Sequence, residues 1–296
     1  MRIGFGPNND VILIFIDRDM MIYRPQIAII GGSGFPKLLG LEVLNKICVR
    51  TKYGRTSDRI SIGEYGGKVI AFLPRHGANH DIFPHQIPYR ANIAALKQIG
   101  VDSIISTSVV GSLKLSIRPG DFVIPDQFIN FTWGRDETIR SNIHENELHH
   151  LPMAKPYCSS LTHLIYLCTK KLRIPAHPKG TVVVIQGPRF STIAESKWFS
   201  SQGWDIVNMT QYPECYFARE MKIHYATIAL VTDYDVGAGN NMQMNTRDID
   251  KVVKIFYNNI DKANKLLLKI IQKLPIEYKC DCKSDLEEVY YKHKKP

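Results

Sequence analysis

Short apolar runs alternate with longer amphipathic segments along most of the chain. Runs of four to eight residues rich in valine and isoleucine, bounded by glycine, proline or polar residues, are typical of buried strands. We expect strands at residues 27–30, 69–73, 103–107, 122–125, 181–185 and 227–231.

The segments between these runs repeat apolar residues at helical spacing. Ile93, Leu96 and Ile99 lie three residues apart and mark one face of a helix. We expect helices at residues 89–99, 161–172, 192–199, 214–221 and from 246 to near 275. Strands that alternate with helices over about 250 residues predict a single α/β domain around a largely buried central sheet.

The two ends of the chain fit this alternation less well. Residues 1–25 do not show this alternation clearly, and Pro25 marks the boundary. We therefore expect an N-terminal extension over residues 1–25, one main domain over residues 26–275 and a tail over residues 276–296.

Composition agrees with a globular protein, with 44% apolar and 22% charged residues. No apolar run approaches the roughly 20 residues that a membrane helix requires. The early run from Val11 to Ile16 is followed at once by Asp17, and it lacks the basic start and cleavage site of a signal peptide. We therefore expect a cytoplasmic protein with no membrane partner.

The net charge of +10 raises the question of a nucleic-acid partner. The excess of basic residues lies in segments such as 37–59 and 170–197, where apolar residues interrupt it. This pattern indicates a cationic surface spread over a folded domain and not a basic arm. A small anionic substrate explains it as well as a polyanion, and we expect no nucleic-acid partner.

Six cysteines in a chain of this length do not indicate a disulfide framework. Cys280 and Cys282 form the one close pair, and the sequence around them offers only His293 as a further metal donor. A zinc site requires a second pair or histidines at metal spacing. We therefore expect a surface thiol pair and no metal.

The loops after the strands are where ligands bind in an open α/β sheet. Gly31-Gly32-Ser33-Gly34 follows the first strand, and its backbone N–H groups suit either an anion or a tight turn. It does not match the dinucleotide fingerprint, because Lys37 stands where the third glycine belongs.

Two further loops carry donors for an anion. Arg75 and His76 follow the second strand, and arginine is the planar, multi-donor partner that phosphate prefers. His80 and His85 nearby leave a metal site as an alternative. Ser108-Val109-Val110-Gly111-Ser112 follows the third strand with two more hydroxyls. Three such loops at one sheet edge can converge on a single phosphate.

Two acids end the last strand, in Thr232-Asp233-Tyr234-Asp235. A carboxylic acid beside a purine N7 can protonate it as the base departs, and a neighbouring carboxylate raises the pKa of that acid. The alternative is an ordinary turn with two solvated acids.

Together these motifs resemble the methylthioadenosine phosphorylase branch of the trimeric purine nucleoside phosphorylase family. The resemblance runs from about Ile27 to Pro275. It rests on AIIGGSGF (28–35), LPRHGANH (73–80), PYRANIAALKQIGV (88–101), SVVGSL (108–113), RPGDFVIPDQFI (118–129), GPRFST (187–192), NMTQYPE (208–214) and TDYDV (232–236). It implies a single domain with a mixed, partly barrel-like central β-sheet flanked by helices.

The resemblance also implies the roles of particular residues. Those that hold phosphate are Ser33, Arg75, His76, Ser108, Val109 and Thr210. Those that contact the nucleoside are Met209 at the ribose, Ser191, Asp233 and Asp235 at the purine, and His150 and Val236 near the 5′ substituent. The catalytic residues are Asp233, Asp235 and His76. Two aspartates favour adenine, because branches that take 6-oxopurines carry asparagine at the base-recognising position.

The implied reaction is phosphorolysis of 5′-methylthioadenosine to adenine and 5-methylthioribose 1-phosphate, a transferase step of purine and methionine salvage. Inorganic phosphate is the second substrate, no metal or organic cofactor is required, and the implied assembly is a homotrimer. Alternatives are a phosphorylase for adenosine, inosine or guanosine, and a nucleotide-binding protein without catalysis. The chain departs from the family at Gln186, where glutamate is common, and over residues 136–147, where the usual Phe-Asp-Gly is missing.

Overall fold

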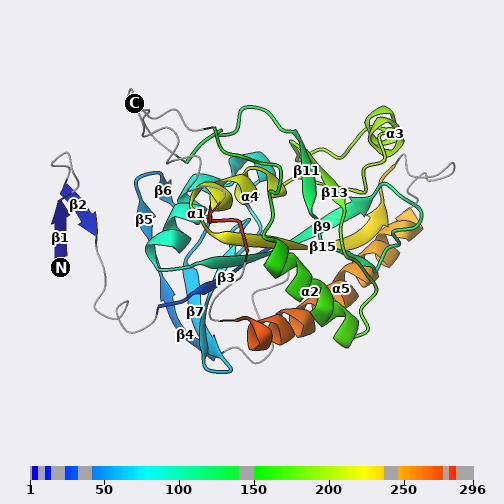
Figure 1. The fold of residues 1–296 in the computed structure, drawn as a ribbon. Helices are drawn as coiled ribbons and strands as arrows, with labels where there is room; N and C mark the ends of the chain where they lie inside the picture. Colours follow the sequence, from blue (N-terminus) through cyan, green and yellow to red (C-terminus); the bar gives the residue numbers. More distant parts are fainter. Residues whose placement is uncertain are drawn as a thin grey trace.

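An eleven-stranded mixed sheet runs through the centre of the molecule, with helices on both of its faces (Figure 1). The computed structural model describes residues 2–5, 11–14, 24–32, 42–139, 150–236, 246–275 and 280–284. The strands of the sheet are β3 (Ile27–Gly31), β4 (Glu42–Ile47), β7 (Ile60–Tyr65), β8 (Lys68–Pro74), β9 (Ser103–Ser112), β10 (Phe122–Val123), β11 (Gln127–Phe131), β12 (Ala176–His177), β13 (Thr181–Ile185), β14 (Ile206–Asn208) and β15 (His224–Tyr234). The helices are α1 (Tyr89–Gln98), α2 (Ser159–Lys171), α3 (Ile193–Ser201), α4 (Gln211–Glu220), α5 (Thr246–Lys273) and the short 3-10 helix η2 (Pro84–Gln86).

The order of strands across the sheet is β11-β13-β14-β9-β3-β8-β7-β4, and β15 branches from β9 to pair also with β10. Strands β8, β3, β9 and β15 run parallel, whereas β7 and β4 add an antiparallel edge. The long strand β9 thus contacts β14, β3 and β15. The described strands do not close into a barrel. The sheet is mixed, as expected. The expected barrel-like part corresponds among the described strands to the branch at β9, where one strand pairs with β14, β3 and β15.

The apolar run of β3 serves both faces of the sheet. Ile27 and Ile29 pack with residues of α2 and α5 in one core cluster. Ala28 and Ile30 pack with residues of α1 and α4 in another. Successive residues of a strand point to opposite faces, so a strand covered by helices on both sides has no polar alternation. This explains why the central strands read as unbroken apolar runs.

All six expected strands and all five expected helices correspond to elements of the structure. Within this sheet, the sequence patterns gave no indication of β4, β7, β11, β12 or β14. Strands β4 and β7 form the antiparallel edge and mix buried with exposed residues. Strand β14 has only three residues. Short strands and edge strands carry too few consecutive apolar residues to register as buried runs.

The register of the parallel strands brings their carboxyl ends to one edge. Ile30 of β3 pairs with Leu73 of β8 and with Ser106 of β9. Gly32, Arg75 and Ser108 therefore follow at the same level, just beyond these pairs. The predicted convergence of the strand-end loops is a consequence of this register.

Strands β1 (Arg2–Phe5) and β2 (Val11–Ile14) form a separate antiparallel pair, and β5 (Arg50–Thr51) and β6 (Gly54–Arg55) form another. The expected boundaries at residues 25 and 275 stay predictions. No helix among the described residues is long and apolar enough to cross a membrane.

Candidate active site

A cavity of about 610 Å³ opens at the edge where the parallel strands end. Ten of the predicted site residues line it: Arg75, His76, Ser108, Val109, Ser191, Met209, Thr210, Asp233, Asp235 and Val236. Ser33 lies outside the described residues. His150 is exposed and is not part of the lining.

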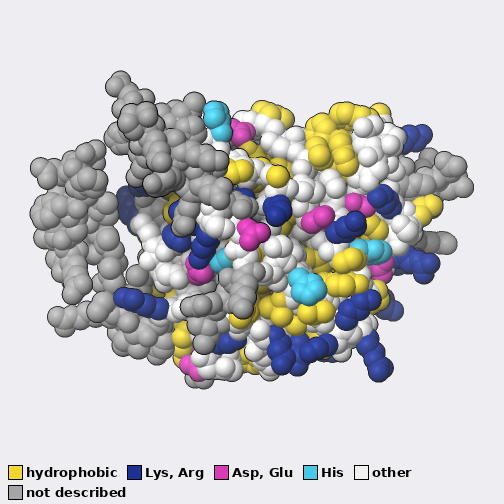
Figure 2. Space-filling model, in the orientation of Figure 1, with side chains coloured by type: hydrophobic (Ala, Val, Ile, Leu, Met, Phe, Trp, Pro, Cys, Tyr) yellow, Lys and Arg dark blue, Asp and Glu magenta, His cyan; other side chains and the backbone are white. Residues whose placement is uncertain are grey.

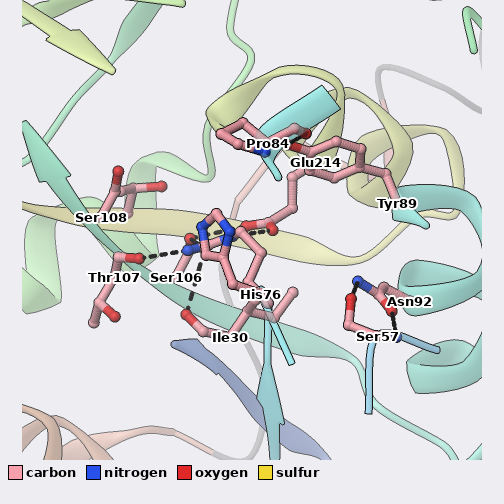
Figure 3. A network of polar contacts seen from close by, with 12 residues as sticks. Ile30, Ser57, His76, Pro84, Tyr89, Asn92, Ser106, Thr107, Ser108 and Glu214 are labelled. Atoms are coloured by element: carbon pink, nitrogen blue, oxygen red, sulfur yellow. Dashed lines mark hydrogen bonds and ion pairs between the residues drawn. The ribbon is translucent and has the colours of Figure 1, made fainter. Parts of the chain in front are cut away.

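Arg75, which directly follows β8, is held by a buried carboxylate. Only 1% of its surface is exposed. Its Nε and Nη2 donate to the two carboxylate oxygens of Glu214 at 2.7 and 2.9 Å, and Nη2 also donates to Ser106 Oγ at 2.6 Å (Figure 3). Burial opposes the charge, but Glu214 raises the pKa of Arg75 above its usual value. The guanidinium is therefore a fixed cation in a fixed orientation.

The remaining nitrogen of this guanidinium lies on the side of the cavity. Nη1 of Arg75 carries two hydrogens, and the carbonyl of Thr107 accepts one of them at 2.9 Å. Gly32, which also lines the cavity, lies close to this nitrogen, because a Cβ there would be 3.9 Å from Nη1. Among the described residues, no second acceptor for Nη1 is present. Nη1 is thus placed to donate to an acceptor in the cavity.

His76 enters the cavity as a neutral imidazole. Its Nδ1 lies 2.8 Å from the carbonyl oxygen of Ile82, which can only accept, so Nδ1 carries the hydrogen and Nε2 the lone pair. Burial and then the charge of Arg75 lower the pKa of His76 to about 4. The ring of His80 lies beside it, with 4.5 Å between ring centroids. Among the described residues, no metal-ligating group includes these histidines.

Hydroxyl groups complete this part of the cavity. Ser108 Oγ accepts from Asn208 Nδ2 at 2.9 Å. Thr210 directly precedes α4, and its hydroxyl makes no capping hydrogen bond. The backbone of α4 is not helical at Tyr212, so the hydroxyl of Thr210 is the donor that this segment offers. The cation and the two hydroxyls therefore suit one oxyanion.

Asp233 and Asp235 are positioned by a bulge near the end of β15. The register with β9 shifts between Val231 and Asp233, and the N–H of Asp235 then donates to Ser112 at 2.8 Å. Gly111 lies against the bulged strand, because a Cβ there would be 3.5 Å from Cβ of Asp235. A bulge of this kind re-aims side chains at the rim of a sheet.

The two acids lie in an environment that favours their protonated forms. Burial raises the pKa of Asp233 to about 6, against a hydrogen bond from Thr232, and the nearby Asp235 adds a smaller rise. Burial also raises the pKa of Asp235 above its usual value, against the hydroxyls of Ser196 and Ser191. Oδ2 of Asp235 is buried and has no hydrogen-bond partner among the described residues. It is therefore available to a ligand.

Apolar side chains form the rest of the lining. Met209 lies against Gly187, where a Cβ would come within 2.7 Å of its sulfur. Further apolar residues of the lining are Ile82, Phe83, Val110, Ile185, Phe190, Val207, Val236, Val252 and Phe256. A mostly apolar cavity with a few convergent polar groups is the usual form of a small-molecule site.

Comparison with known proteins identifies the family. The family model of the phosphorylase superfamily matches residues 26–272. The chain belongs to the phosphorylase superfamily.

Relatives within the superfamily match the chain over nearly its whole length. S-methyl-5'-thioadenosine phosphorylase of Pyrococcus furiosus is 43% identical over 266 residues, which cover 90% of this chain and 99% of that protein. The probable 6-oxopurine nucleoside phosphorylase of Dictyoglomus turgidum is 44% identical over 263 residues, covering 89% and 97%. The solved structure of methylthioadenosine phosphorylase from Schistosoma mansoni in complex with adenine matches with a TM-score of 0.82 at 32% identity, covering 91% of this chain and 98% of its own. The predicted fold class is confirmed.

Gln186, where the resemblance leads us to expect glutamate, has defined hydrogen-bond partners. Oε1 of Gln186 accepts from the N–H of Trp133 at 3.1 Å and from Nε of Arg135 at 3.2 Å. Arg135 in turn donates to the carbonyl of Met209 at 3.0 Å. Gln186 thus supports the loop that carries Met209, and it does so without the charge of a glutamate.

Several residues of the site were not predicted from the sequence. They are Glu214, Ser106, Asn208, Pro188, Phe190, Thr232 and Phe256. Asn208 and Glu214 are the first and last residues of the motif NMTQYPE. Their place in this motif was the signal that could have identified them, because a buried polar side chain requires a partner. Nothing in the sequence pairs Glu214 with an arginine 139 residues away.

Proposed function

We propose that this protein catalyses phosphorolysis of 5′-methylthioadenosine, giving adenine and 5-methylthioribose 1-phosphate. It would act as a nucleoside phosphorylase, a pentosyltransferase. The observation that carries the proposal is one cavity containing both an anion site around Arg75 and a buried acid, Asp233, with a pKa of about 6. Membership of the phosphorylase superfamily supports phosphate as the second substrate.

The phosphate would bind at the end of the cavity that Arg75, His76, Ser108 and Thr210 line. Arg75 contributes Nη1, the two hydroxyls donate, and the backbone at Val109 completes the wall. The lone pair on Nε2 of His76 suits the remaining proton of hydrogen phosphate. A bound dianion favours the imidazolium form and would raise the pKa of His76 from its unliganded value near 4. Ser33 is proposed for the same site on its sequence motif alone.

The purine would bind against Asp233 and Asp235. Asp233 in its protonated form donates to N7, and the Asp235 carboxylate accepts from the 6-amino group. Ser191, buried in the lining beside Asp235, supports the same edge of the base. A carboxylate has no donor for a 6-oxo group, so the pair selects against 6-oxopurines.

The reaction would proceed by electrostatic stabilisation. A phosphate oxygen attacks C1′ as the bond from C1′ to N9 breaks, and the electron pair of that bond moves into the purine. The proton from Asp233 on N7 neutralises the departing base, while the phosphate charge stabilises the cationic sugar. Preorganised charges of this kind are usually the largest part of catalysis. The proposed chemistry requires no metal or organic cofactor.

The 5′-methylthio group would rest on the apolar lining near Met209, Val236 and Val252. His150 lies outside the cavity of its own chain, so a role for it at the 5′ group would require a neighbouring copy. We include a homotrimer in the proposal for this reason. A cytoplasmic location remains an expectation.

A second candidate function is phosphorolysis of 6-oxopurine nucleosides. The Dictyoglomus turgidum relative, named a probable 6-oxopurine nucleoside phosphorylase, is as similar to this chain as the Pyrococcus furiosus relative. Overall identity therefore does not decide between the two substrates. The two aspartates favour the 6-amino purine.

The deciding experiment is a base-release assay with purified full-length protein. Methylthioadenosine, adenosine and inosine are each incubated with and without phosphate, and the free base is measured by chromatography. We expect adenine from methylthioadenosine only when phosphate is present. Preferred release of hypoxanthine from inosine would support the 6-oxopurine function, and release without phosphate would indicate a hydrolase. No release from any substrate would favour a binding protein.

A further inference from the structure

Three cysteines and a histidine gather at the end of β15 that lies away from the acids. The four residues are Cys158, His224, Cys280 and Cys282, and their ligand atoms all lie within 4.8 Å of one another. Cys158 is the N-cap of α2, His224 opens β15, and the other two lie in the segment 280–284 after α5. The close pair of the sequence thus acquires two donors from distant parts of the chain.

The separations between these atoms suit a tetrahedral centre. Zinc bonds of about 2.3 Å to sulfur and 2.0–2.1 Å to nitrogen place tetrahedral ligands about 3.8 Å apart for two sulfurs and about 3.6 Å apart for sulfur and nitrogen. Cys158 Sγ lies 3.7 Å from Cys280 Sγ and 3.5 Å from His224 Nδ1. His224 Nδ1 lies 3.3 Å from Cys280 Sγ and 3.0 Å from Cys282 Sγ. His224 Nδ1 and Cys282 Sγ are closer than in a formed site, and the two sulfurs of the pair, 2.7 Å apart, would have to separate by about 1 Å around a cation.

The second nitrogen of His224 lies near a carboxylate, the group that often stands behind a metal-bound histidine. Nε2 lies 3.7 Å from Oδ2 of Asp102, which is longer than a hydrogen bond, and the backbone N–H of His224 donates to the backbone carbonyl of Asp102 at 2.9 Å. A small movement of the Asp102 side chain would let it accept from Nε2 and direct Nδ1 toward the metal. Asp102 also pairs with Lys283 at 2.6 Å, which ties the segment of the two cysteines to the same point.

The four residues are largely enclosed by the fold. Cys158 and His224 are buried, and Cys280 and Cys282 pack against the core cluster that includes residues of α2 and α5. Cys158 is fixed at the start of α2 and His224 at the start of β15, so two of the four donors are positioned by regular elements. Four donor atoms of the kinds that zinc prefers therefore meet in one enclosed place.

We propose that Cys158, His224, Cys280 and Cys282 bind one Zn²⁺ ion in a structural site. Four protein ligands leave no open position for water, which is typical of structural and not catalytic zinc. The site is also remote from the proposed chemistry, because the nine residue steps along β15 from His224 to Asp233 span about 30 Å. Its role is to fasten the segment 280–284 to the starts of α2 and β15. This departs from the expectation that the close cysteine pair is a surface thiol pair.

The proposal is tested on full-length protein purified under reducing conditions without added metal and without chelator. Zinc is measured by mass spectrometry of the elements, before and after incubation with ZnCl₂ and removal of the excess. We expect about one zinc per chain in the wild type and at least a tenfold lower content in Cys280→Ser and in Cys282→Ser. Cys48→Ser, which removes an exposed cysteine outside the group, is the matched control and should retain zinc.

Circular dichroism shows whether each variant is folded, and neither readout depends on the proposed phosphorolysis. Substitution with Co²⁺ gives a second test, because thiolate ligands produce a strong charge-transfer absorption that the two variants should lack. A zinc-free wild type after reconstitution, or equal zinc in wild type and variants, would overturn the proposal. A disulfide between Cys280 and Cys282 that persists under reduction, with no metal bound, would do the same.

Discussion

At the scale of single residues, the charged groups of the site depend on their tertiary surroundings. Arg75 is fixed by Glu214, and Asp233 takes its raised pKa mainly from burial. The sequence predicted both Arg75 and Asp233, and it assigned the raised pKa to the neighbouring carboxylate. Asp235 contributes, but less than burial does. Residue identities were therefore predictable, whereas their environments depend on tertiary contacts.

Replacing Asp233 by asparagine should lower activity and raise stability. The amide cannot transfer a proton to N7, so we expect kcat for methylthioadenosine to fall by about 100-fold or more. The free energy of unfolding at pH 7.5 should rise by on the order of 1–3 kcal/mol, because the variant no longer buries a charge. Steady-state kinetics and urea unfolding measure the two effects. An unchanged kcat would remove Asp233 from the acid role.

The stability effect has a defined pH window. The folded-state pKa of Asp233, about 6, lies above the ordinary value of 3.8, so the folded protein holds this proton more tightly than the unfolded chain. The resulting contribution to stability is full below pH 4 and is lost as pH rises through 6. The gain from Asp233→Asn should therefore be largest above pH 6 and small near pH 4. A gain that is independent of pH would contradict burial as its cause.

Replacing Glu214 by glutamine should act on phosphate binding. The neutral amide leaves the buried charge of Arg75 uncompensated, which costs about 3 kcal/mol of stability. We expect KM for phosphate to rise at least tenfold while KM for the nucleoside changes little. Glu195→Gln, which alters an exposed pair with Arg189, is the matched control and should change neither constant. Equal changes in both KM values would indicate a general loss of structure.

At the scale of elements, the strands and helices that surround the site were predictable and the loops that shape it were not. The unbroken apolar run at β3 and the amphipathic pattern at α5 were enough to predict these two elements. Strands β4 and β7, which form the antiparallel side of the sheet, left no comparable signal. The bulge before Asp233 and the close contact at Gly187 depend on tertiary packing, which a local pattern does not encode.

Gly187→Ala tests the shape of the loop beside Met209. Gly187 has φ of +65°, and a Cβ there would come within 2.7 Å of the Met209 sulfur. Gly203 has φ of +78° with nothing within 4 Å, so Gly203→Ala carries the same backbone strain without the contact. We expect both variants to lose about 1–2 kcal/mol of stability, and only Gly187→Ala to raise KM for methylthioadenosine. Equal KM values in the two variants would place Met209 outside the nucleoside site.

At the scale of the whole molecule, β15 connects two proposed sites. Asp233 lies near its carboxyl end, and His224 opens its other end beside the cysteines. The first site could be predicted from ordered motifs, because its residues follow neighbouring parallel strands. The second could not, since Cys158 and Cys280 are separated by 122 residues and share no motif.

Large exposed aromatic side chains provide the physical basis for an assembly. Trp133, Phe190 and Trp198 are 73%, 78% and 50% exposed. Figure 2 shows hydrophobic side chains gathered over the region of α3, which carries Trp198. Trp198 packs on Phe131 with 5.2 Å between ring centroids, and the N–H of Trp133 donates to Gln186, four residues before Phe190. An exposed apolar patch of this kind is typical of a subunit interface.

If this patch forms the interface of the proposed trimer, a charge placed in it should separate the subunits. We expect Trp133→Glu to shift the mass measured by light scattering from three chains toward one. Phe190 belongs to both the patch and the cavity lining, whereas His150 lies outside the cavity of its own chain. If the neighbouring subunit completes the cavity, the separated subunit should also lose activity toward methylthioadenosine. Leu167→Glu, at a 45% exposed position on α2, is the matched control and should remain a trimer. A wild-type protein that is monomeric and fully active would contradict the trimer, and the 5′ group would then be bound by one chain alone.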